Sequence, residues 1–422
     1  MRPESVTARP GAVAFVVFQA GSQADGGVES VTQIIERLRG FRLLVVTQAE
    51  TEANQRWRRA GAEVHVWPLP YVMGSPRGGR SWRDGRLARA ASTLGTNLRF
   101  LRLLRARGVR VVHCNDVLAL LHVGFGARLA GARVVFNVRA AKPAGERYGP
   151  RWKLAHALSH ATVVLSAEMR GDVAARALPP GRLAHPERIR VIRTGVDPAR
   201  LSPAAPGERE RLRRELGIAP GEFAVGCVAV INRRKGQLPL LRDALPALLR
   251  EVPAARLHLV GGPDPRDPEY AEDCRRAAEE AGAGAVRFAG FTGRVEDWYR
   301  ALDAVVLASR GEGLARCMIE SLACGTPVVS FDVCSAREVL EAHGCGVVVP
   351  QGDYAGLAQA LAALGRDPAL CERLGLAGAA AARELFDPER MIADYAALYR
   401  GGAEARGASP QPAPAAAETA SW

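Results

Sequence analysis

Two glutamates eight residues apart, Glu312 and Glu320, lie in the stretch of the 422-residue chain whose residue types are best suited to chemistry. Glu312 lies in a glycine-rich loop, and Glu320 lies on the helix that we expect to follow it. A helix rises about 1.5 Å per residue, so the two carboxylates are ~12 Å apart or less along its axis. At that distance they cannot share one proton or one metal ion, but they can hold two ends of an extended ligand. Two solvated acids on a surface helix are the alternative.

The loop around Glu312 joins a predicted strand, residues 304–308, to a helix with Met318, Ile319 and Leu322 on its apolar face. A glycine ends this helix, and a proline enters the next predicted strand. Such a unit places the helix N-terminus at the carboxyl edge of a parallel sheet. The free backbone N–H groups and partial positive charge of that N-terminus favour an anion such as a diphosphate.

Three consecutive cations, Arg233, Arg234 and Lys235, follow another predicted strand, residues 224–230. The chain has three lysines and 54 arginines, so a lysine is more informative here than an arginine. Cations at this strand end would face a diphosphate from the side opposite the Glu312 loop. A solvated turn is the alternative interpretation.

The first half of the chain has a similar pattern at Gly26 and Gly27, which follow the first predicted strand and open a helix. Glycine allows the backbone to approach a ligand closely at a helix N-terminus. Asp116 and Arg139 each follow a later predicted strand. All four residues therefore belong to the carboxyl edge of one predicted sheet.

Short β-branched segments alternate with helical patterns along most of the chain. Continuous apolar strands between helices predict parallel sheets that are covered on both faces. We therefore predict an α/β fold with two doubly wound, Rossmann-like domains. The predicted strands are residues 13–18, 43–46, 64–67, 109–113, 134–138, 162–165, 190–192, 224–230, 256–260, 286–289, 304–308, 327–331 and 346–349.

A cluster of prolines and glycines interrupts the pattern near residue 200 and suggests the division between the domains. We expect a first domain at 1–200, a second at 201–385, a helix at 386–400 that crosses back to the first, and a disordered tail at 401–422. The first 200 residues carry 32 basic and 14 acidic residues, a net charge of +18. The remainder carries −5, which suggests that the two domains have different partners.

The segment from Ser309 to Val329 resembles the E-x7-E signature of the retaining glycosyltransferases of family 4, also called glycosyl transferases group 1. Glu312 and Glu320 match its two glutamates. Residues 226–237 look like the family's first donor-domain strand and Lys-Gly turn, and the resemblance extends over most of the chain. It implies the GT-B fold, in which an acceptor domain and a nucleotide-sugar domain face each other across a cleft.

The resemblance also implies roles for the matched residues. Glu312 would hydrogen-bond sugar hydroxyls, and Lys235 with Arg233 would stabilise the leaving diphosphate. Many members carry an arginine where Val230 stands here, so Arg233 or Arg234 would have to substitute for it. The catalytic residues implied are therefore Glu312, Lys235 and Arg233.

Donor and acceptor residues follow in the same way. Glu320 would bind the ribose, and Arg139, which stands where many members have a histidine, would face the acceptor or the leaving diphosphate. The residues implied to bind the donor are Glu320, Gly313, Leu314, Arg234, Gly290 and Phe291. Those implied to form the acceptor and phosphate loop are Gly26, Gly27, Asp116 and Arg139.

The implied reaction moves a hexosyl unit from a UDP- or GDP-sugar to a glycan acceptor, expected to be lipid-linked, in bacterial envelope polysaccharide synthesis such as that of lipopolysaccharide or capsule. Cations and a helix N-terminus would stabilise the leaving group without a cofactor or a metal ion. The chain has no Asp-x-Asp motif of the kind that holds a metal on a nucleotide-sugar. A nucleotide-sugar epimerase of the same fold and a non-catalytic protein that binds nucleotide-sugar or membrane are the alternatives.

Residues 76–110 contain ten arginines and one acid, with leucines at helical spacing between them. A basic amphipathic segment is typical of membrane-surface binding, with about 1 kcal/mol of attraction to anionic lipid per cation. We expect a cytoplasmic protein that is peripheral on the inner face of the plasma membrane. A solvated helix in an arginine-rich chain is the alternative, and nucleic-acid binding is not expected because no recognition motif accompanies the arginines.

Other features restrict the class of protein further. No apolar run approaches the ~18–20 residues needed to span a bilayer. The eight cysteines form no Cys-x-x-Cys pair, which favours buried thiols in a reducing compartment. Arg2, Arg9 and the apolar run at 12–18 could imitate a signal peptide, but the run is short and fits a buried first strand better.

Overall fold

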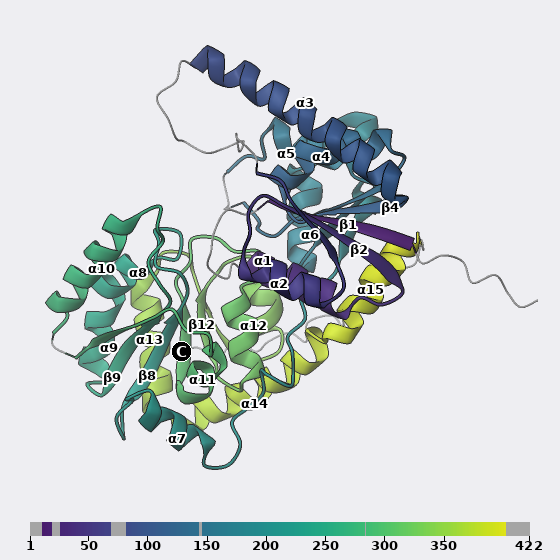
Figure 1. Ribbon diagram of the computed structural model, residues 1–422. Helices are drawn as coiled ribbons and strands as arrows, with labels where there is room; N and C mark the ends of the chain where they lie inside the picture. The colour runs from purple at the N-terminus through teal and green to yellow at the C-terminus, as the bar shows by residue number, and fades with distance from the viewer. Residues whose placement is uncertain (1–10, 19–25, 69–81, 143–145, 283, 402–422) are drawn as a thin grey trace, which may run out of the picture.

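The computed structural model describes residues 11–18, 26–68, 82–142, 146–282 and 284–401, and for residues 82–89 the backbone only. In this part of the chain two parallel sheets, each flanked by helices, form two domains (Figure 1). The signal-peptide alternative at the extreme N-terminus and the tail at 402–422 lie outside the described residues.

The first sheet has seven strands in the order β3-β2-β1-β4-β5-β6-β7, and every pairing is parallel. Its order reverses next to β1, where chain connections leave in opposite directions and ligands commonly bind. The strands are β1 (Gly11–Val17), β2 (Phe41–Thr47), β3 (Glu63–Val66), β4 (Val109–Cys114), β5 (Arg133–Asn137), β6 (Ala161–Val164) and β7 (Ile189–Val191).

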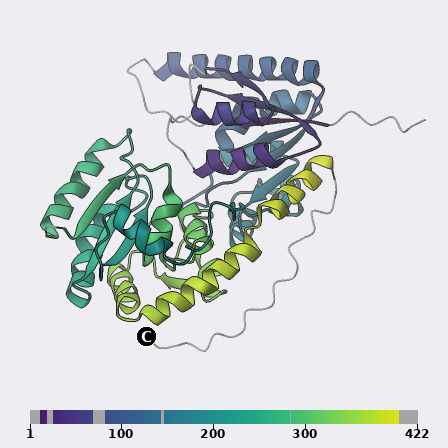
Figure 2. The same ribbon diagram turned by 60° about the horizontal axis from the view of Figure 1, so that its bottom comes forward.

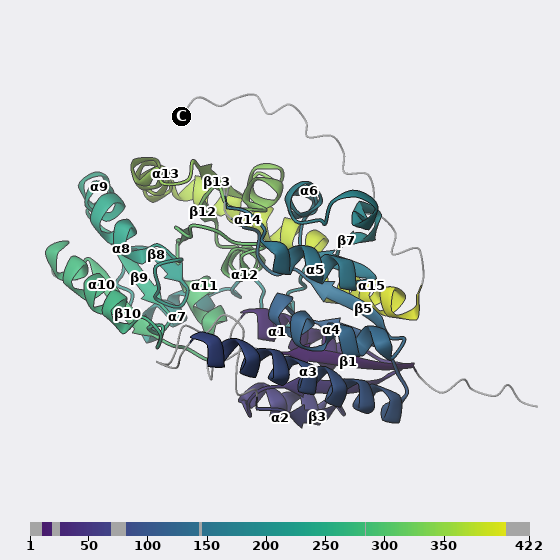
Figure 3. The ribbon, with the colours of Figure 1, turned by 90° about the horizontal axis from the view of Figure 1, so that it is seen from above.

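The helices of the first domain run between these strands. They are α1 (Gly26–Arg37), α2 (Glu52–Arg59), α3 (Trp82–Arg107), α4 (Val117–Leu129), α5 (Pro150–Leu158) and α6 (Ala167–Arg176), with short 3₁₀ turns η1 (Gly181–Leu183) and η2 (Pro186–Arg188) before β7. Figure 3 shows helices on both sides of this sheet.

The second sheet has six parallel strands in the order β10-β9-β8-β11-β12-β13, so its order reverses beside β8. The strands are β8 (Phe223–Val228), β9 (Ala255–Val260), β10 (Val286–Gly290), β11 (Ala304–Leu307), β12 (Val328–Phe331) and β13 (Gly346–Val349). The α-helices are α7 (Glu208–Glu215), α8 (Gln237–Pro239), α9 (Leu245–Glu251), α10 (Pro268–Glu280), α11 (Val295–Ala301), α12 (Arg316–Ala323), α13 (Tyr354–Arg366) and α14 (Pro368–Leu385). The π-helical segments are η3 (Leu240–Ala244) and η4 (Arg337–Glu341).

Burial on both faces explains why the strands are so apolar. Along β1, Ala14 and Val16 pack into one apolar cluster, whereas Val13 and Phe15 pack into another on the opposite face. Successive side chains of a strand point to opposite faces, so a sheet covered on both sides needs apolar residues at every position. The prediction of two parallel, doubly covered sheets is confirmed, and each of the thirteen predicted strands is present.

The last helix, α15 (Pro388–Arg400), leaves the second domain after α14 and lies against the first (Figures 1 and 2). Its residues Met391, Ile392, Tyr395 and Tyr399 belong to the apolar cluster that contains Phe15. A side chain at Gly195 would bring its Cβ within 2.6 Å of the Pro388 Cα, so the start of α15 also packs tightly on the segment that follows β7. In the part of the chain that the structure describes, no helix has the length and apolar character needed to cross a bilayer.

Candidate active site

A buried ion pair joins two loops at the carboxyl edge of the second sheet. The Lys235 Nζ lies 2.6 Å from Glu312 Oε1, and a guanidinium nitrogen of Arg234 lies 3.3 Å from Glu312 Oε2. Lys235 and Glu312 expose 14% and 10% of their side chains, so both charges are largely withdrawn from water. Three residues that the sequence predicted on opposite sides of a ligand therefore lie in direct contact.

Backbone contacts hold the two loops together. Gly236 adopts a φ of 73°, and a Cβ there would come within 2.2 Å of the Ala308 carbonyl oxygen at the end of β11. Arg310 N–H donates to the Arg234 carbonyl at 2.9 Å, and the Arg234 side chain donates to the Gly311 carbonyl at 3.0 Å. The glycine that follows Lys235 is thus required both for its left-handed backbone and for this close approach.

The charge of Glu312 is set by two opposing effects. Burial raises the pKa of its carboxyl, but the positive charges of Lys235 and Arg234 outweigh burial and hold the pKa below the ordinary value of 4.5. Glu312 is therefore a carboxylate at neutral pH, available as a hydrogen-bond acceptor.

Arg233 does not join this cluster. Its Nε donates to Asp267 Oδ2 at 2.8 Å, its guanidinium lies over the Tyr270 ring, and 61% of its side chain is exposed. Of the two adjacent arginines, Arg234 is the one that the structure places against Glu312.

Gly313, the next residue after Glu312, touches the first domain. It forms an isolated antiparallel bridge with Ala140, and a Cβ on Gly313 would lie 2.3 Å from the Arg139 carbonyl oxygen. Leu314 is buried in the apolar core, so its side chain serves packing. The loop that carries Glu312 is therefore also a point of contact between the two domains.

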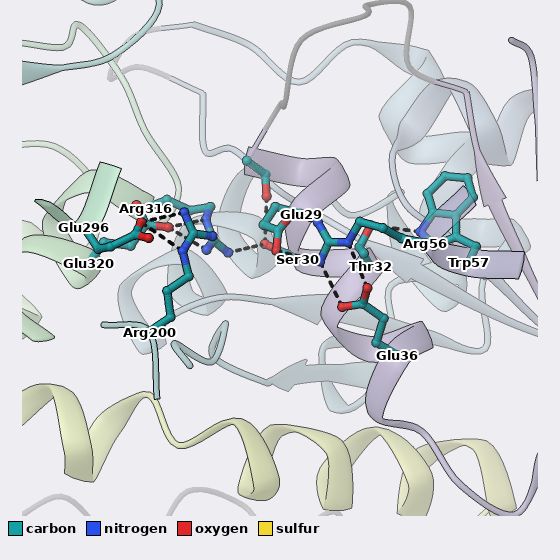
Figure 4. A network of polar contacts seen from close by, with 11 residues as sticks. Glu29, Ser30, Thr32, Glu36, Arg56, Trp57, Arg200, Glu296, Arg316 and Glu320 are labelled. Atoms are coloured by element: carbon teal, nitrogen blue, oxygen red, sulfur yellow. Dashed lines mark hydrogen bonds and ion pairs between the residues drawn. The ribbon is translucent and has the colours of Figure 1, made fainter. Parts of the chain in front are cut away.

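Glu320 lies on α12 one turn after Arg316 and is paired with it (Figure 4). Arg316 donates to Glu320 Oε1 from Nε at 2.9 Å and from a terminal nitrogen at 2.6 Å, and the Tyr299 hydroxyl donates to Oε2 at 3.1 Å. Arg316 also reaches the Ser30 hydroxyl on α1 at 3.4 Å. A Cβ on Gly26 would lie 2.8 Å from Arg316 Cδ, so α1 and α12 approach each other closely here.

The contact extends along α1 as a chain of charges (Figure 4). Arg56 on α2 bonds both Glu29 and Glu36 on α1. Burial raises the pKa of Glu29, but hydrogen bonding and charge from Arg56, with the charges of Arg316 and Arg200, hold it below 4.5. Arg316 of the second domain and Arg200, near the division between the domains, thus help to lower the pKa of a carboxyl group in the first domain.

Around the first domain's carboxyl edge, buried Asn115 joins two of the predicted residues. Its side-chain oxygen accepts from Arg139 at 2.8 and 3.0 Å, and its side-chain nitrogen donates to the Gly27 carbonyl at 3.4 Å. Asp116 caps α4 by accepting from the Ala119 N–H at 2.8 Å. Gly27 and Arg139 are therefore linked through Asn115, whereas Asp116 has a structural role at the start of a helix.

Gly290 and Phe291 lie at the end of β10, at the outer edge of the second sheet. Gly290 has a φ of 73°, and its carbonyl accepts from the Gly261 N–H at 2.8 Å. Phe291 exposes 60% of its surface. An exposed aromatic ring therefore follows a left-handed glycine at this edge of the second sheet.

Three residues at the junction were not among the predicted site residues: Asn115, Arg316 and Ser335. Ser335 donates from its hydroxyl to the Gly313 carbonyl at 2.7 Å, and its N–H donates to Glu168 of the first domain at 2.7 Å. Asn115 directly precedes Asp116, and Arg316 lies between Glu312 and Glu320, so the sequence could have indicated both as candidate site residues. No sequence pattern indicates Ser335.

Glu338, at the start of η4, forms a second junction between the domains. It accepts from Arg193 at 2.5 Å and from the Glu168 N–H at 3.0 Å. Burial raises the pKa of the Glu168 carboxyl, and the negative charges of Asp332 and Glu338 raise it further.

The burial of most cysteines agrees with the prediction of buried thiols. All eight are free, six of them buried and two half-buried. Burial raises the pKa of the Cys227 thiol to about 12. In the ranges described above, no cluster of three His, Cys, Asp or Glu side chains has an arrangement that could hold a metal ion.

Comparison with known proteins places a family model on each domain. "Glycosyltransferase Family 4" matches residues 26–200, and "Glycosyl transferases group 1" matches residues 222–367. The D-inositol 3-phosphate glycosyltransferase 1 of Catenulispora acidiphila is 32% identical over 228 residues, which are 52% of this chain and 54% of that protein. The lipopolysaccharide core biosynthesis mannosyltransferase LpsB of Rhizobium meliloti is 28% identical over 212 residues, 50% of this chain and 60% of that protein. The chain thus spans little more than half the length of these relatives.

Solved structures resemble both domains together. HepE of Anabaena in complex with UDP has a TM-score of 0.76 at 19% identity, covering 92% of this chain and 99% of that chain. WaaG, a glycosyltransferase involved in lipopolysaccharide biosynthesis, has a TM-score of 0.66 at 19% identity, covering 92% and 100%. Two parallel Rossmann-like domains with these neighbours define a GT-B fold, as predicted. The chain belongs to the family 4 glycosyltransferases, glycosyl transferases group 1.

Proposed function

We propose that the protein transfers a hexosyl unit, with retention of anomeric configuration, from a nucleoside diphosphate sugar to a glycan acceptor. The observation that carries the proposal is the buried contact of Glu312 with Lys235 beside Gly313, the residue where the two domains touch. A donor held at this edge of the second domain would present its sugar to an acceptor on the first. Family membership and the GT-B fold support the same reaction.

The reaction needs stabilisation of a diphosphate that gains charge as it leaves. Lys235 and Arg234 are cations held beside Glu312 in the loop between β8 and α8, and the N-terminus of α12 adds a partial positive charge. Glu312 accepts hydrogen bonds from sugar hydroxyls in this proposal, and Glu320 from the ribose. Arg233 then serves the outer part of the site, because its charge is paired with Asp267.

The donor is proposed to be a UDP- or GDP-sugar, and the acceptor a lipid-linked glycan of bacterial envelope polysaccharide. Support comes from the neighbour HepE, which is described in complex with UDP-glucose, and from relatives named for lipopolysaccharide and inositol phosphate glycosylation. The proposed location is the inner face of the plasma membrane, reached through residues 76–110. Of that segment, the structure describes residues 82–110, which comprise α3 and the start of β4.

The proposal is tested by incubating the protein with a panel of UDP- and GDP-sugars and measuring nucleotide release with and without membrane extract. A matching donor should release nucleotide only when extract is present. Glu312→Gln and Lys235→Met should each lower this release about 100-fold or more. Exposed Glu251→Gln and Lys153→Met are the matched controls and should retain the wild-type rate.

Other outcomes assign other functions. Conversion of the donor to a second sugar without extract would identify an epimerase of the same fold. Donor-induced thermal stabilisation without turnover would identify a non-catalytic binding protein. The anomeric configuration of the product, read by NMR, decides whether the transfer retains that of the donor.

A further inference from the structure

The outer surface of the first domain carries an open apolar groove between α3 and α4. It has a volume of about 570 Å³. Figures 1 and 3 show the two helices side by side, with α3 on the outside. The lining residues include Leu94, Leu98, Phe125, Gly126, Leu129 and Arg151.

Large apolar side chains that a soluble surface normally hides gather here. Leu94, Leu98, Phe125 and Leu129 expose 62%, 44%, 49% and 67% of their surface. Seven large apolar residues of the described chain are exposed by 44% or more, and four of them lie in this one groove. Scattered exposed leucines need no explanation, but a contiguous group indicates a binding surface.

The packing of the two helices creates the groove. Gly126 donates its N–H to the Asn97 side chain at 2.7 Å, and a Cβ on Gly126 would lie 2.3 Å from the Asn97 carbonyl oxygen. Backbone therefore forms the floor. Phe100 and Leu104 of α3 are buried in the core, whereas Leu94 and Leu98 of the same helix are exposed and line the groove.

Charge around the groove favours one occupant. From Ala90 onward α3 has no acidic residue, and neither have α4 and α5, whereas the three helices carry seven basic ones. Some are neutralised or turned away: Arg107 pairs with Glu63, and Arg99 lies over the Trp67 ring. Arg151 of α5 lines the groove itself, and Arg105 of α3 donates to the Leu129 carbonyl, so positive charge from α3 and α5 borders the apolar stripe.

We propose that this groove docks on an anionic lipid bilayer, with Leu94, Leu98, Phe125 and Leu129 inserted among the acyl chains. Apolar side chains bordered by arginine match lipid tails below anionic headgroups. A second copy of the chain would place Arg105 and Arg151 against the same positive charges, because a two-fold interface brings identical surfaces together. The bilayer is therefore the favoured partner.

The inference deepens the proposed membrane location by adding α4, which the basic segment 76–110 does not include. Phe125 lies nine residues after Asp116, roughly 13 Å along the axis of α4. Asp116 follows Asn115, which contacts Arg139 at the junction of the domains. A docked α4 would thus hold the acceptor side of the site close to the lipid surface.

Vesicle binding tests the proposal without any sugar transfer, so the proposed reaction and the proposed surface can fail separately. The full-length protein should co-sediment with phosphatidylcholine vesicles containing about 30% phosphatidylglycerol and bind pure phosphatidylcholine much less. Leu94→Ser/Leu98→Ser and Phe125→Ser/Leu129→Ser should each weaken binding roughly tenfold or more. Leu183→Ser/Leu376→Ser, which alters leucines of 59% and 67% exposure elsewhere, is the control and should bind as the wild type does.

The contrary outcomes are distinct. Absence of wild-type binding, or equal loss in the control, overturns the proposal. Unchanged binding of both groove variants would assign the membrane contact to other residues and overturns it as well. If the wild type is a dimer and the groove variants are monomers, the occupant is a second copy of the chain. If the wild type binds an acidic helical peptide that the groove variants fail to bind, the occupant is a protein partner. Either result overturns the proposal. Thermal unfolding of each variant confirms that the surface substitutions leave the fold intact.

Discussion

Ser335 and Gly313 are joined by a hydrogen bond of 2.7 Å from the serine hydroxyl to the glycine carbonyl oxygen. Ser335 has a φ of 75° and, among the described residues other than glycine, is alone in adopting a positive φ. Its N–H donates a hydrogen bond to the carboxylate of Glu168 in the first domain. A residue with a strained backbone thus connects the first domain to the loop that carries Glu312.

Removing that hydroxyl should loosen the loop. Ser335→Ala loses the hydrogen bond and keeps the strained backbone, so we expect a loss of about 1 kcal/mol of stability and a lower kcat. Ser335→Gly loses the same bond but relieves roughly 1 kcal/mol of strain, so it should be about as stable as the wild type and still have the lower kcat. Urea unfolding and steady-state kinetics on the three proteins measure both effects. Full turnover by Ser335→Ala would show that the bond does not position the loop.

Gly313→Ala should push the two domains apart. The new Cβ would lie 2.3 Å from the Arg139 carbonyl oxygen, a backbone atom that cannot rotate away. We expect an increase in the radius of gyration by X-ray scattering and loss of most nucleotide release. Gly293→Ala is the matched control in the same domain, because nothing lies within 4 Å of its Cβ position. Equal behaviour of the two variants would contradict the close contact at Gly313.

The ion pair between Lys235 and Glu312 should appear as an energetic coupling. Lys235→Met leaves a buried carboxylate whose remaining ion pair in the described structure is with the half-exposed Arg234, and removal of one partner of a buried pair costs about 3 kcal/mol. Glu312→Gln should cost a similar amount, while Lys235→Met/Glu312→Gln should be more stable than either single variant. A double-mutant cycle from urea unfolding measures the coupling. Additive losses would mean that the two side chains do not interact in solution.

The fold could be predicted because every local signal agreed with it. The strands are apolar at every position, which a parallel sheet covered on both faces requires, and glycines and prolines mark where helices end. That Lys235 and Glu312 lie at the same sheet edge could be expected, since both follow strands of one parallel sheet, but the sequence predicted them on opposite sides of a ligand. The distance between the two side chains could not be predicted, because the number of residues between them does not show how far a loop folds over the sheet edge.

The details that the sequence did not supply depend on backbone conformation. Arg233 and Arg234 are adjacent and chemically equal, and only the path of the turn before Gly236 directs one to Asp267 and the other to Glu312. Ser335 occupies a conformation that serine rarely adopts, so composition does not indicate it. Arg316 stands inside the matched motif, but its contact with Ser30 requires the relative position of the two domains.

His113 on β4 joins the first domain to α15 and should make stability depend on pH. Its Nδ1 lies 2.6 Å from the Tyr399 hydroxyl, and the ring is fully buried. Burial, with a smaller contribution from the positive charge of Arg139, lowers the pKa of His113 from 6.5 to about 3. The folded protein therefore keeps this ring neutral at a pH where the unfolded chain protonates it.

The direction of the effect follows from proton uptake. Between pH 6.5 and 3 the unfolded state binds a proton that the folded state does not, so the stability due to neutral His113 is complete above pH 6.5 and falls as the pH drops. By pH 5 the loss amounts to ~2 kcal/mol. Urea unfolding of the wild type should show this loss of stability between pH 7.5 and pH 5. In His113→Phe the loss of stability between the same two pH values should be smaller by ~2 kcal/mol. Tyr399→Phe, which removes the hydrogen bond but leaves His113 buried, should be less stable at both pH values and keep the full pH dependence. An equal loss in the wild type and His113→Phe would mean that His113 titrates as a solvent-exposed histidine does.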